Sequence, residues 1–340
     1  MKRKFLALIL LAITSTALAQ QVKIMNLDHP EVSFRGLSVV DNSVLWVSGT
    51  KGTIGVSYNG GNSFNWVNPK GYEERDFRAI AALNHSTLLA VAIGSPGIIL
   101  KTTDSGKSWK EVYRDENPNV FLDDINFTEY NPALGMVVGD PINGEAYVLK
   151  TVDSGDSWTK METTQLPNFE KGEAFFAASN SNLKLLDETT FIAVTGGNQS
   201  HILYNSVPPV KVPLKKTNST TSGANGMDYY TLGNFGLIVG GDFQQPDSSE
   251  NNLFIFEIKE MKNPVVTLPE VPPLGYKSGV VIQNATTAYS CGLKGVDITT
   301  DKGKTWKNLT QTAYHSCKKA KNGKTIYLTG PQGRIGYILE

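Results

Sequence analysis

The stretch "LKTTDSGKSW", residues 100–109, has close copies elsewhere in the same chain. The copies are "LKTVDSGDSW" (149–158), "DITTDKGKTW" (297–306) and, more loosely, "GVSYNGGNSF" (55–64). All four fit the pattern Ser/Thr-x-Asp/Asn-x-Gly-x-Ser/Thr-Trp/Phe. A short pattern that repeats within one chain is either a repeated binding site or a repeated structural element, and the spacing and chemistry of the copies decide between them.

The spacing of the copies indicates a chain built from one repeated unit. The Asp or Asn of the pattern falls at Asn59, Asp104, Asp153 and Asp301, with separations of 45, 49 and 148 residues. Because 148 is close to three times 49, two further units without the pattern should lie between 153 and 301. Two segments there have an apolar strand, a Gly pair and a second apolar strand: "FIAVTGGNQSHILYNS" (191–206) and "GLIVGGDFQQPDSSENNLFIFEI" (236–258).

Each unit has the same predicted order of strands. Short apolar runs, rich in Val, Ile and aromatic residues and bounded by Gly, Asn and Asp, are typical of β-strands. A first strand is followed by a second that ends in Gly, a third, the repeated turn and a short fourth strand. The predicted first strands include "FRGLSVV", "FRAIAAL", "DDINFT", "AFFAAS" (174–179) and "KSGVVIQ". Four strands in every 40–50 residues indicate an all-β fold, a β-propeller.

We predict a single domain over residues 20–340 with seven blades, although six or eight are also compatible with the count. The last blade offers only three strands before Glu340, so we expect the strand at 21–27 to complete it and to close the ring without an open edge. The approximate blade boundaries are 32–68, 75–114, 119–163, 172–214, 222–270, 276–310, and 313–340 together with 21–27.

The repeated turn is best interpreted as structural. The Asp side chain can accept hydrogen bonds from nearby backbone N–H groups, and the Gly can adopt a positive φ. The terminal aromatic residue should then pack between neighbouring blades. Calcium would require several oxygen ligands in one loop, whereas each copy offers one carboxylate, so we predict no metal site. The predicted structural set is Asn59, Asp104, Gly106, Trp109, Asp153, Gly155, Trp158, Asp301, Gly303 and Trp306.

The N-terminus indicates export. Residues 1–19 read Lys2-Arg3-Lys4, an apolar run and Ala17-Leu18-Ala19, the pattern of a signal peptide cleaved after Ala19. We therefore expect a secreted or periplasmic protein with no transmembrane segment in the mature chain. The three basic residues of this leader are among 32 in the whole chain, so 29 remain against 32 acidic residues. This balance argues against nucleic-acid binding.

The repeated turn resembles the Asp-box of the bacterial-neuraminidase-type (BNR) repeat, and the resemblance covers the whole mature chain. Further segments, such as "FRGLSVVDNSVLWVSGTKGTIGVS", "VVGDPINGEAYVLKTVDSGDSW" and "GEAFFAASNS", are similar in order to the photosystem II stability/assembly factor-like propellers and their non-photosynthetic bacterial relatives. The resemblance implies a monomeric binding or assembly module. Its expected partner is a protein or a membrane-protein complex of the cell envelope.

The first strands of a propeller surround its channel, so polar residues at their starts should meet at the channel mouth. The candidates are Arg35, Arg78, Asp124, Asp140, Glu173, Tyr276, Lys277 and His315, and Asp123 could reach the same place. These residues are either the mutually paired lining of a wet channel or a binding pocket. Such a pocket would take an anionic or polyhydroxy ligand or a peptide end, with Arg35 and Arg78 as charge partners.

A carbohydrate-active propeller, sialidase-like or otherwise, is the alternative function, with a glycan as its partner. A glycosidase needs two carboxyl groups flanking the scissile bond, and Glu173 with Asp124 is the candidate catalytic pair. We expect an open pocket between them in a glycosidase, and ion pairs to Arg35 and Arg78 in a scaffold. The chain has no nucleotide-binding fingerprint that would support an oxidoreductase, and we predict no cofactor. The two cysteines, Cys291 and Cys317, form either a disulfide or two buried thiols.

Overall fold

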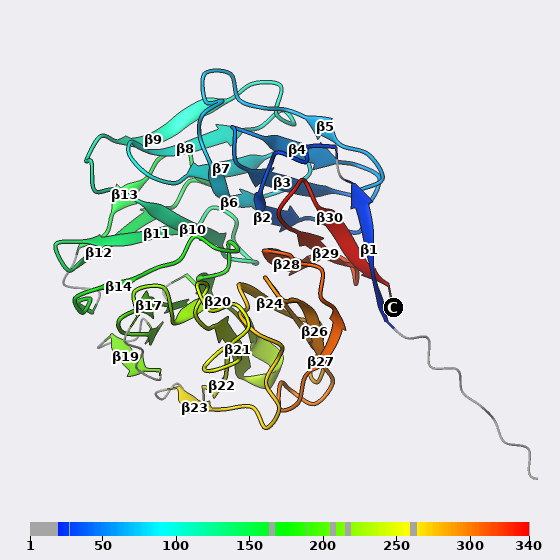
Figure 1. Cartoon of the computed structure of the whole chain (residues 1–340). Helices are drawn as coiled ribbons and strands as arrows, with labels where there is room; N and C mark the ends of the chain where they lie inside the picture. The colour runs from blue at the N-terminus through cyan, green and yellow to red at the C-terminus, as the bar shows by residue number, and fades with distance from the viewer. Residues whose placement is uncertain are drawn as a thin grey trace, which may run out of the picture.

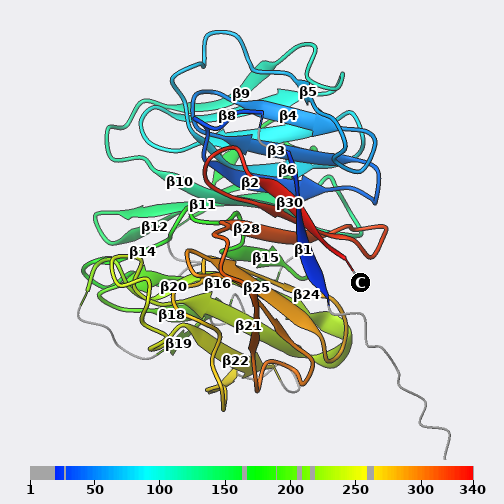
Figure 2. The ribbon, with the colours of Figure 1, turned by 45° about the vertical axis from the view of Figure 1, so that its right-hand side comes forward.

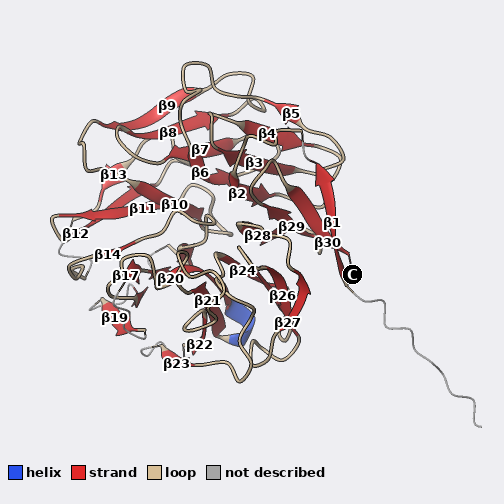
Figure 3. Ribbon diagram, viewed as in Figure 1, coloured by secondary structure: helices blue, strands red, loops and turns tan. Residues whose placement is uncertain are grey.

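The computed structural model describes residues 20–26, 28–162, 167–188, 190–204, 209–214, 219–258 and 264–339. The predicted signal peptide at 1–19 lies outside these residues. Seven four-stranded antiparallel sheets surround a common axis (Figures 1 and 3), and the helical element in this part of the chain is the 3-10 turn Thr231–Gly233. The prediction of an all-β, seven-bladed propeller is confirmed.

The blades follow one another along the chain, and each runs from an inner to an outer strand. Blade 1 contains β2 (Phe34–Val39), β3 (Leu45–Gly49), β4 (Ile54–Ser57) and β5 (Asn65–Trp66); blade 2 contains β6 (Phe77–Ala82), β7 (Leu88–Ala92), β8 (Gly97–Thr102) and β9 (Lys110–Asp115); blade 3 contains β10 (Leu122–Phe127), β11 (Gly135–Ile142), β12 (Glu145–Thr151) and β13 (Thr159–Lys160). Blade 4 contains β15 (Leu183–Leu185), β16 (Phe191–Val194), β18 (His201–Tyr204) and β19 (Val210–Pro213); blade 5 contains β20 (Ala224–Tyr230), β21 (Phe235–Gly240), β22 (Leu253–Glu257) and β23 (Val265–Thr267); blade 6 contains β24 (Gly279–Ile282), β25 (Ala288–Gly292), β26 (Gly295–Thr299) and β27 (Lys307–Thr310).

Blade 7 joins the two ends of the chain. Its strands are β28 (Ser316–Lys319), β29 (Ile326–Thr329), β30 (Ile335–Leu339) and, as the outermost, β1 (Gln21–Asn26). β1 pairs antiparallel with β30, with Gln21 opposite Leu339 and Ile24 opposite Gly336. Figures 1 and 2 show β1 beside β30 next to the C-terminus. The predicted ring closure by the N-terminal strand is therefore confirmed.

The hydrophobic core lies between blades. The buried apolar residues form seven clusters within the described part of the chain, and each cluster joins residues of two adjacent blades. For example, Trp46 and Val56 of blade 1 pack with Phe77 and Leu100 of blade 2. The cluster between blades 7 and 1 includes the partly buried Met25 of β1. Every interface of the ring thus has its own apolar layer.

The repeated turn is held by the same set of contacts in all four copies, except that the Asn59 amide donates to the Ser63 hydroxyl where the three aspartates accept a hydroxyl bond. In blade 2, the Asp104 carboxylate accepts bonds from the Ser108 N–H (2.9 Å), the Ser108 hydroxyl (2.6 Å) and the Thr102 hydroxyl (2.8 Å). The Gly106 N–H donates to Thr102 Oγ1 at 2.9 Å. These bonds, led by those from Ser108, lower the pKa of Asp104 to about 2. Equivalent bonds surround Asp153, Asp301 and Asn59.

The glycine of each turn also makes room for the preceding blade. Gly106 has a φ of 81°, and a Cβ placed on it would lie 2.6 Å from the Val67 side chain, which follows the last strand of blade 1. Gly155 and Gly303 likewise have positive φ and abut Leu89 of blade 2 and Leu237 of blade 5. The indole N–H of Trp109 donates to the Val67 carbonyl at 3.1 Å. The turn therefore contributes directly to the contact between blades.

The inner strand of blade 4 differs from the prediction, so the expected strand "AFFAAS" is wrong. Only its first residue, Ala174, is in a strand, β14 (Glu173–Ala174), which forms a two-residue ladder with β17 (Gly196–Gly197). The chain then leaves the sheet, and the inner strand is the three-residue β15. The physical reason is that residues 177–182 make their hydrogen bonds to other blades, as described below.

We predict that Gly106→Ala destabilises the protein more than Gly71→Ala. Both glycines have a positive φ (81° and 88°), but a Cβ at Gly71 would meet nothing within 4 Å. The backbone strain alone should cost about 1 kcal/mol at either site, and overlap with Val67 should add about 1–3 kcal/mol at Gly106. Urea unfolding of both variants measures the difference, and equal losses would contradict the proposed contact with blade 1.

Removal of β1 should loosen the whole ring. A chain starting at Asp28 loses the β1–β30 ladder and leaves β30 as an open edge, so it should melt at least about 5–10 °C below a chain starting at Gln20. A synthetic peptide of residues 20–26 should restore part of the loss. Thermal unfolding monitored by circular dichroism is the measurement, and identical melting of the two chains would refute ring closure by β1.

Candidate functional site

A buried polar segment crosses the axis of the propeller. Residues 177–182, "AASNSN", which we call the central segment, are all buried. The segment is bonded to every other blade. Its contacts are Ala178 O with Arg35 (3.0 Å), Asn180 Oδ1 with Ile80 N (2.8 Å), Asn180 Nδ2 with Asp124 (2.6 Å), Ser181 O with Met227 N (2.7 Å), Ser179 Oγ with Ser278 O (2.6 Å), and Ser179 O with Ser316 Oγ (2.9 Å). The central segment therefore closes the channel between its two ends.

Two arginines lie together on the mouth side of the central segment. Arg35 is at the start of β2 and Arg78 at the start of β6, in adjacent blades. Arg78 Nε donates to the Asp76 carboxylate at 2.7 Å. Arg35 forms no ion pair within the described residues, and its partner there is the Ala178 carbonyl. Burial, and then the positive charge of Arg78, lowers the pKa of Arg35. The two guanidinium groups therefore carry two positive charges, and Asp76 compensates only one of them.

His315 lies beside these arginines. Its Nε2 is 3.1 Å from the Ser33 hydroxyl. Burial lowers the pKa of His315 well below its ordinary value, and the charges of Arg35, Arg78 and Arg334 lower it further. The imidazole is therefore neutral, and it adds a polar group without adding charge.

Aromatic side chains continue the mouth on the side of blades 4 and 5. The Tyr276 hydroxyl donates to Asn225 Oδ1 at 2.8 Å. The Tyr276 ring lies edge-on to the Phe243 ring, with 6.4 Å between the ring centroids. Phe243 contacts Phe176 at 6.0 Å and is 39% exposed. Sequence reasoning missed Phe176 and Phe243, because both resemble ordinary strand residues. Lys277 is fully buried in an ion pair with Asp297 and is structural.

The Asp124 carboxylate is fully hydrogen-bonded, and its bonds join blades 3 and 4. It accepts hydrogen bonds from Asn180 Nδ2 (2.6 Å), the Leu183 N–H (2.9 Å) and the N–H of Ile125 (2.8 Å). Burial raises its pKa, although these bonds and Lys318 oppose the shift. The side chain therefore joins β10 to the central segment and β15.

Glu173 is also fully engaged. One oxygen accepts bonds from the Thr195 hydroxyl (2.6 Å) and His201 Nδ1 (2.8 Å), and the other from Lys211 Nζ (2.7 Å) and the Glu170 N–H (2.8 Å). Burial alone would raise its pKa, but these bonds lower it to about 2. Glu173 and Asp124 thus have structural partners, and those partners are not Arg35 and Arg78.

Asp140 and Asp123 form a second pair of carboxyl groups. Asp140 accepts a bond from the Phe175 N–H at 3.0 Å, and burial raises its pKa to about 6. Asp123 is 0% exposed, and burial followed by the charge of Asp140 raises its pKa well above the ordinary value. Neither oxygen of Asp123 has a well-formed hydrogen bond within the described chain, although the Ala177 N–H is close enough to favour the ionised form.

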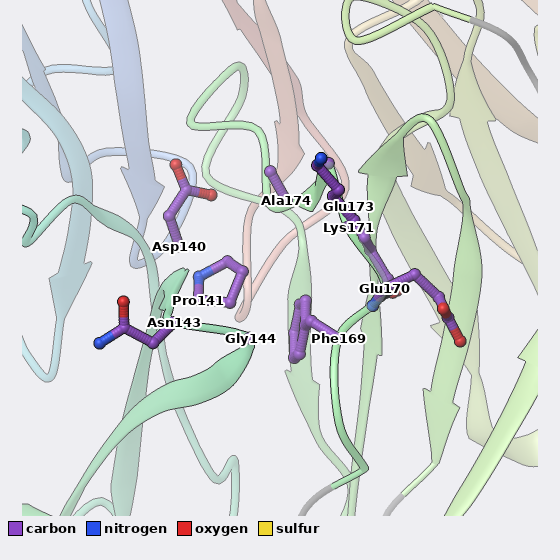
Figure 4. A pocket seen from close by; sticks show the side chains of 10 residues that line it. Asp140, Pro141, Asn143, Gly144, Phe169, Glu170, Lys171, Glu173 and Ala174 are labelled. Atoms are coloured by element: carbon purple, nitrogen blue, oxygen red, sulfur yellow. Dashed lines mark hydrogen bonds between the residues drawn. The ribbon is translucent and has the colours of Figure 1, made fainter.

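A pocket of about 560 Å³ opens beside Asp140. Figure 4 shows Asp140, Pro141 and Asn143 of the β11–β12 hairpin on one side, and Phe169, Glu170, Lys171 and Glu173 on the other. Of the predicted site residues, the structure therefore brings Asp140 and Glu173 together at this pocket, and Arg35, Arg78, Tyr276 and His315 at the mouth.

The two cysteines are buried free thiols, which corrects the disulfide alternative. Cys291 is in β25 and Cys317 in β28, and both pack in the apolar layer between blades 6 and 7. The Cys317 thiol donates to the Tyr289 carbonyl at 3.8 Å. Burial raises the pKa of Cys317 well above its ordinary value, so the thiol stays protonated and unreactive.

The raised pKa of Asp140 predicts a pH-dependent gain of stability in Asp140→Asn. The folded state binds this proton more tightly than the unfolded state, so ionisation destabilises the fold as pH rises from about 4 to 6. The Asn variant keeps an acceptor for the Phe175 N–H and should gain on the order of 2 kcal/mol at pH 7 and nothing at pH 4. Urea unfolding between these pH values tests this, with the exposed Glu116→Gln as a control; a pH-independent difference would contradict it.

Comparisons with known proteins identify the fold. No protein-family model matches the chain, and no curated protein sequence matches it. Similar solved structures are YCF48 bound to D1 peptide (14% identity, 95% of this chain and 97% of that one, TM-score 0.64), YCF48 from Cyanidioschyzon merolae (14%, 93% and 98%, 0.65) and the WD40 β-propeller domain of Doa1 (12%, 94% and 97%, 0.61). Within the described residues, no helix is long and apolar enough to span a membrane. At these identities the likeness shows the fold alone, which is a seven-bladed β-propeller.

Proposed function

We propose that this protein is an exported binding scaffold that holds a segment of a partner protein at the channel mouth. The single observation that carries the proposal is the adjacent pair Arg35 and Arg78. Two guanidinium groups at the starts of neighbouring inner strands repel each other, and Asp76 is paired with only one of them. An anionic group placed between them would be held by charge-assisted hydrogen bonds.

The surroundings of the pair suit a peptide better than a small ion. Neutral His315 and the Tyr276–Phe243–Phe176 aromatic group lie on the same mouth, so a carboxylate and an apolar side chain can be bound together. The central segment keeps the ligand on this face because it closes the channel below. A solved propeller of similar fold carries a D1 peptide, which supports a peptide as the ligand class.

Export and family membership are part of the proposal. The charged and apolar leader ending at Ala19 supports secretion or a periplasmic location, and hence a partner in the cell envelope. The identical bonding around Asp104, Asp153 and Asp301 supports the interpretation of the repeated turn as an Asp-box. The resemblance of the sequence to photosystem II assembly factor-like propellers supports a role in assembling membrane-protein complexes.

The carbohydrate-active alternative gains no support from the candidate catalytic pair. A general acid or nucleophile needs a carboxyl group that can reach the substrate. Glu173 and Asp124 are both buried, and each is held by several hydrogen bonds to the surrounding blades. We therefore do not carry the glycosidase forward as a second function.

The proposal predicts that Arg35→Ala/Arg78→Ala loses its partner. Each arginine should contribute about 1.5–3 kcal/mol to binding of an anionic group, which is about a tenfold to hundredfold change in affinity. Pull-down from an envelope extract, with mass spectrometry, compares wild type with the double variant. Peptides from the captured protein, tested as free acids and as amides, then show whether a terminal carboxylate is bound.

The control is Arg114→Ala, which removes an exposed arginine of β9 that is paired with Glu111 and Glu116. This variant should capture the same partner as wild type. Equal capture by wild type and the double variant would refute the mouth as the binding site. Thermal unfolding of all three proteins checks that the losses do not come from misfolding.

A further inference from the structure

A third arginine, Arg334, lies at the same mouth as Arg35 and Arg78. It follows the turn between β29 and β30, and its Nη1 donates to the Ala313 carbonyl at 2.8 Å, just before the inner strand of blade 7. Its Nη2 is 3.4 Å from the amide oxygen of the exposed Gln332. Within the described residues Arg334 forms no ion pair, so its positive charge meets only neutral groups.

Backbone hydrogen bonds hold Arg334 close to the start of blade 1. The Phe34 N–H donates to Gly330 O at 3.0 Å, and the Gly333 N–H donates to Val32 O at 2.7 Å. Both bonds join the β29–β30 turn to the segment in which β2 begins, and Figure 1 shows β2 next to β28 and β29. The three arginines of the mouth therefore come from three consecutive blades, 7, 1 and 2.

His315 lies among these three arginines. Burial lowers its pKa first, and the charges of Arg35, Arg78 and Arg334 lower the pKa further, so all three guanidinium groups act on one imidazole. Its Nε2 is within hydrogen-bond distance of the Ser33 hydroxyl. A neutral imidazole and a hydroxyl can bond to polar atoms of a ligand, but they cannot balance the charge of the arginines.

The mouth carries more positive charge than the fold compensates. Of the three guanidinium groups, only that of Arg78 has a carboxylate partner among the described residues, which is Asp76 at 2.7 Å. The Asp123 carboxyl group is also close enough to Arg78 to feel its charge. Burial raises the pKa of Asp123 well above its ordinary value, which favours the protonated form and leaves it without negative charge. Two positive charges therefore remain, and a ligand with a single carboxylate would balance only one.

We propose that the mouth binds a polypeptide end whose last residue is Asp or Glu, so that one ligand brings two carboxylates. Arg35 and Arg78 hold one of them, and Arg334 holds the other by charge-assisted hydrogen bonds. An acidic terminal residue suits the site because a few bonds separate its carboxylates, just as the arginines are spread over three blades. The inference rests on the proposed function and deepens it by naming the chemistry of the bound segment.

The test uses three short peptides that differ only in the last residue. Nα-acetyl-Ala-Ala-Asp carries both carboxylates, Nα-acetyl-Ala-Ala-Asn carries only the terminal one, and Nα-acetyl-Ala-Ala-Asp-amide carries only the one on the side chain. Titration of the wild-type protein followed by NMR should give an affinity for the first peptide about tenfold or more above that for each of the others. This is the ratio expected when one charge-assisted contact is lost.

Arg334→Ala, and the more conservative Arg334→Gln, should lower the affinity for the aspartate peptide to about that for the asparagine peptide. Arg334→Lys keeps the positive charge and should retain part of the preference. The exposed Arg114→Ala is the matched control and should keep all of it. Thermal unfolding checks that each variant is folded, and if Arg334→Ala does not fold, Arg334→Gln decides.

Equal affinity of the wild type for the aspartate and asparagine peptides would overturn this proposal. A preference that persists in the folded neutral variants of Arg334, or no binding of any peptide by the wild type, would overturn it as well. The proposed function is decided separately by the pull-down with Arg35→Ala/Arg78→Ala, because that experiment measures capture of the whole partner and does not depend on its last residue.

Discussion

Burial of apolar side chains in this protein takes place between blades and not within them. A four-stranded sheet has two faces, and here each face is covered by the neighbouring sheet, so each of the seven apolar clusters belongs to two blades. A single blade has no core of its own and cannot be stable alone. The consequence is that the ring must close. Pairing of β1 with β30 supplies the last contact, because it joins the first residues of the ring to the last.

The same constraint explains why the charged residues of the inner strands did not identify a catalytic pair. The inner strands are surrounded by protein, so their polar side chains and the backbone groups they meet must be hydrogen-bonded. Asp124 and Asp228 bond to N–H groups of the next blade, Ser316 bonds to Arg35 O, and the central segment supplies donors and acceptors to the remaining blades. A carboxylate at the start of an inner strand is therefore expected to hold neighbouring blades together by hydrogen bonds. It becomes a candidate for binding only where its oxygens lack such partners.

The fold could be predicted from the sequence because its signals are local. The spacing from Asn59 to Asp301 gave six blades, and the three strands that follow, together with the strand left over at 21–27, gave the seventh blade and the ring closure. The central segment could not be predicted, because "AFFAAS" has the short apolar run of a buried strand and the bonds that hold residues 177–182 outside the sheet come from the six other blades. Its buried Ser-Asn-Ser-Asn run was the available signal. The roles of Phe243 and Arg334 were missed for the same reason, since long-range proximity decides them.

Charges that the fold leaves uncompensated are the remaining guide to function. Two positive charges held together repel each other, so the proximity of Arg35 and Arg78 is unfavourable in the isolated protein. These arginines lie where the inner strands β2 and β6 begin, whereas Asp124 and Glu173 nearby are fully bonded. Because the fold satisfies the carboxylates of Asp124 and Glu173 and leaves the arginine pair only partly compensated, an anionic group of the proposed partner would relieve the repulsion between the two arginines.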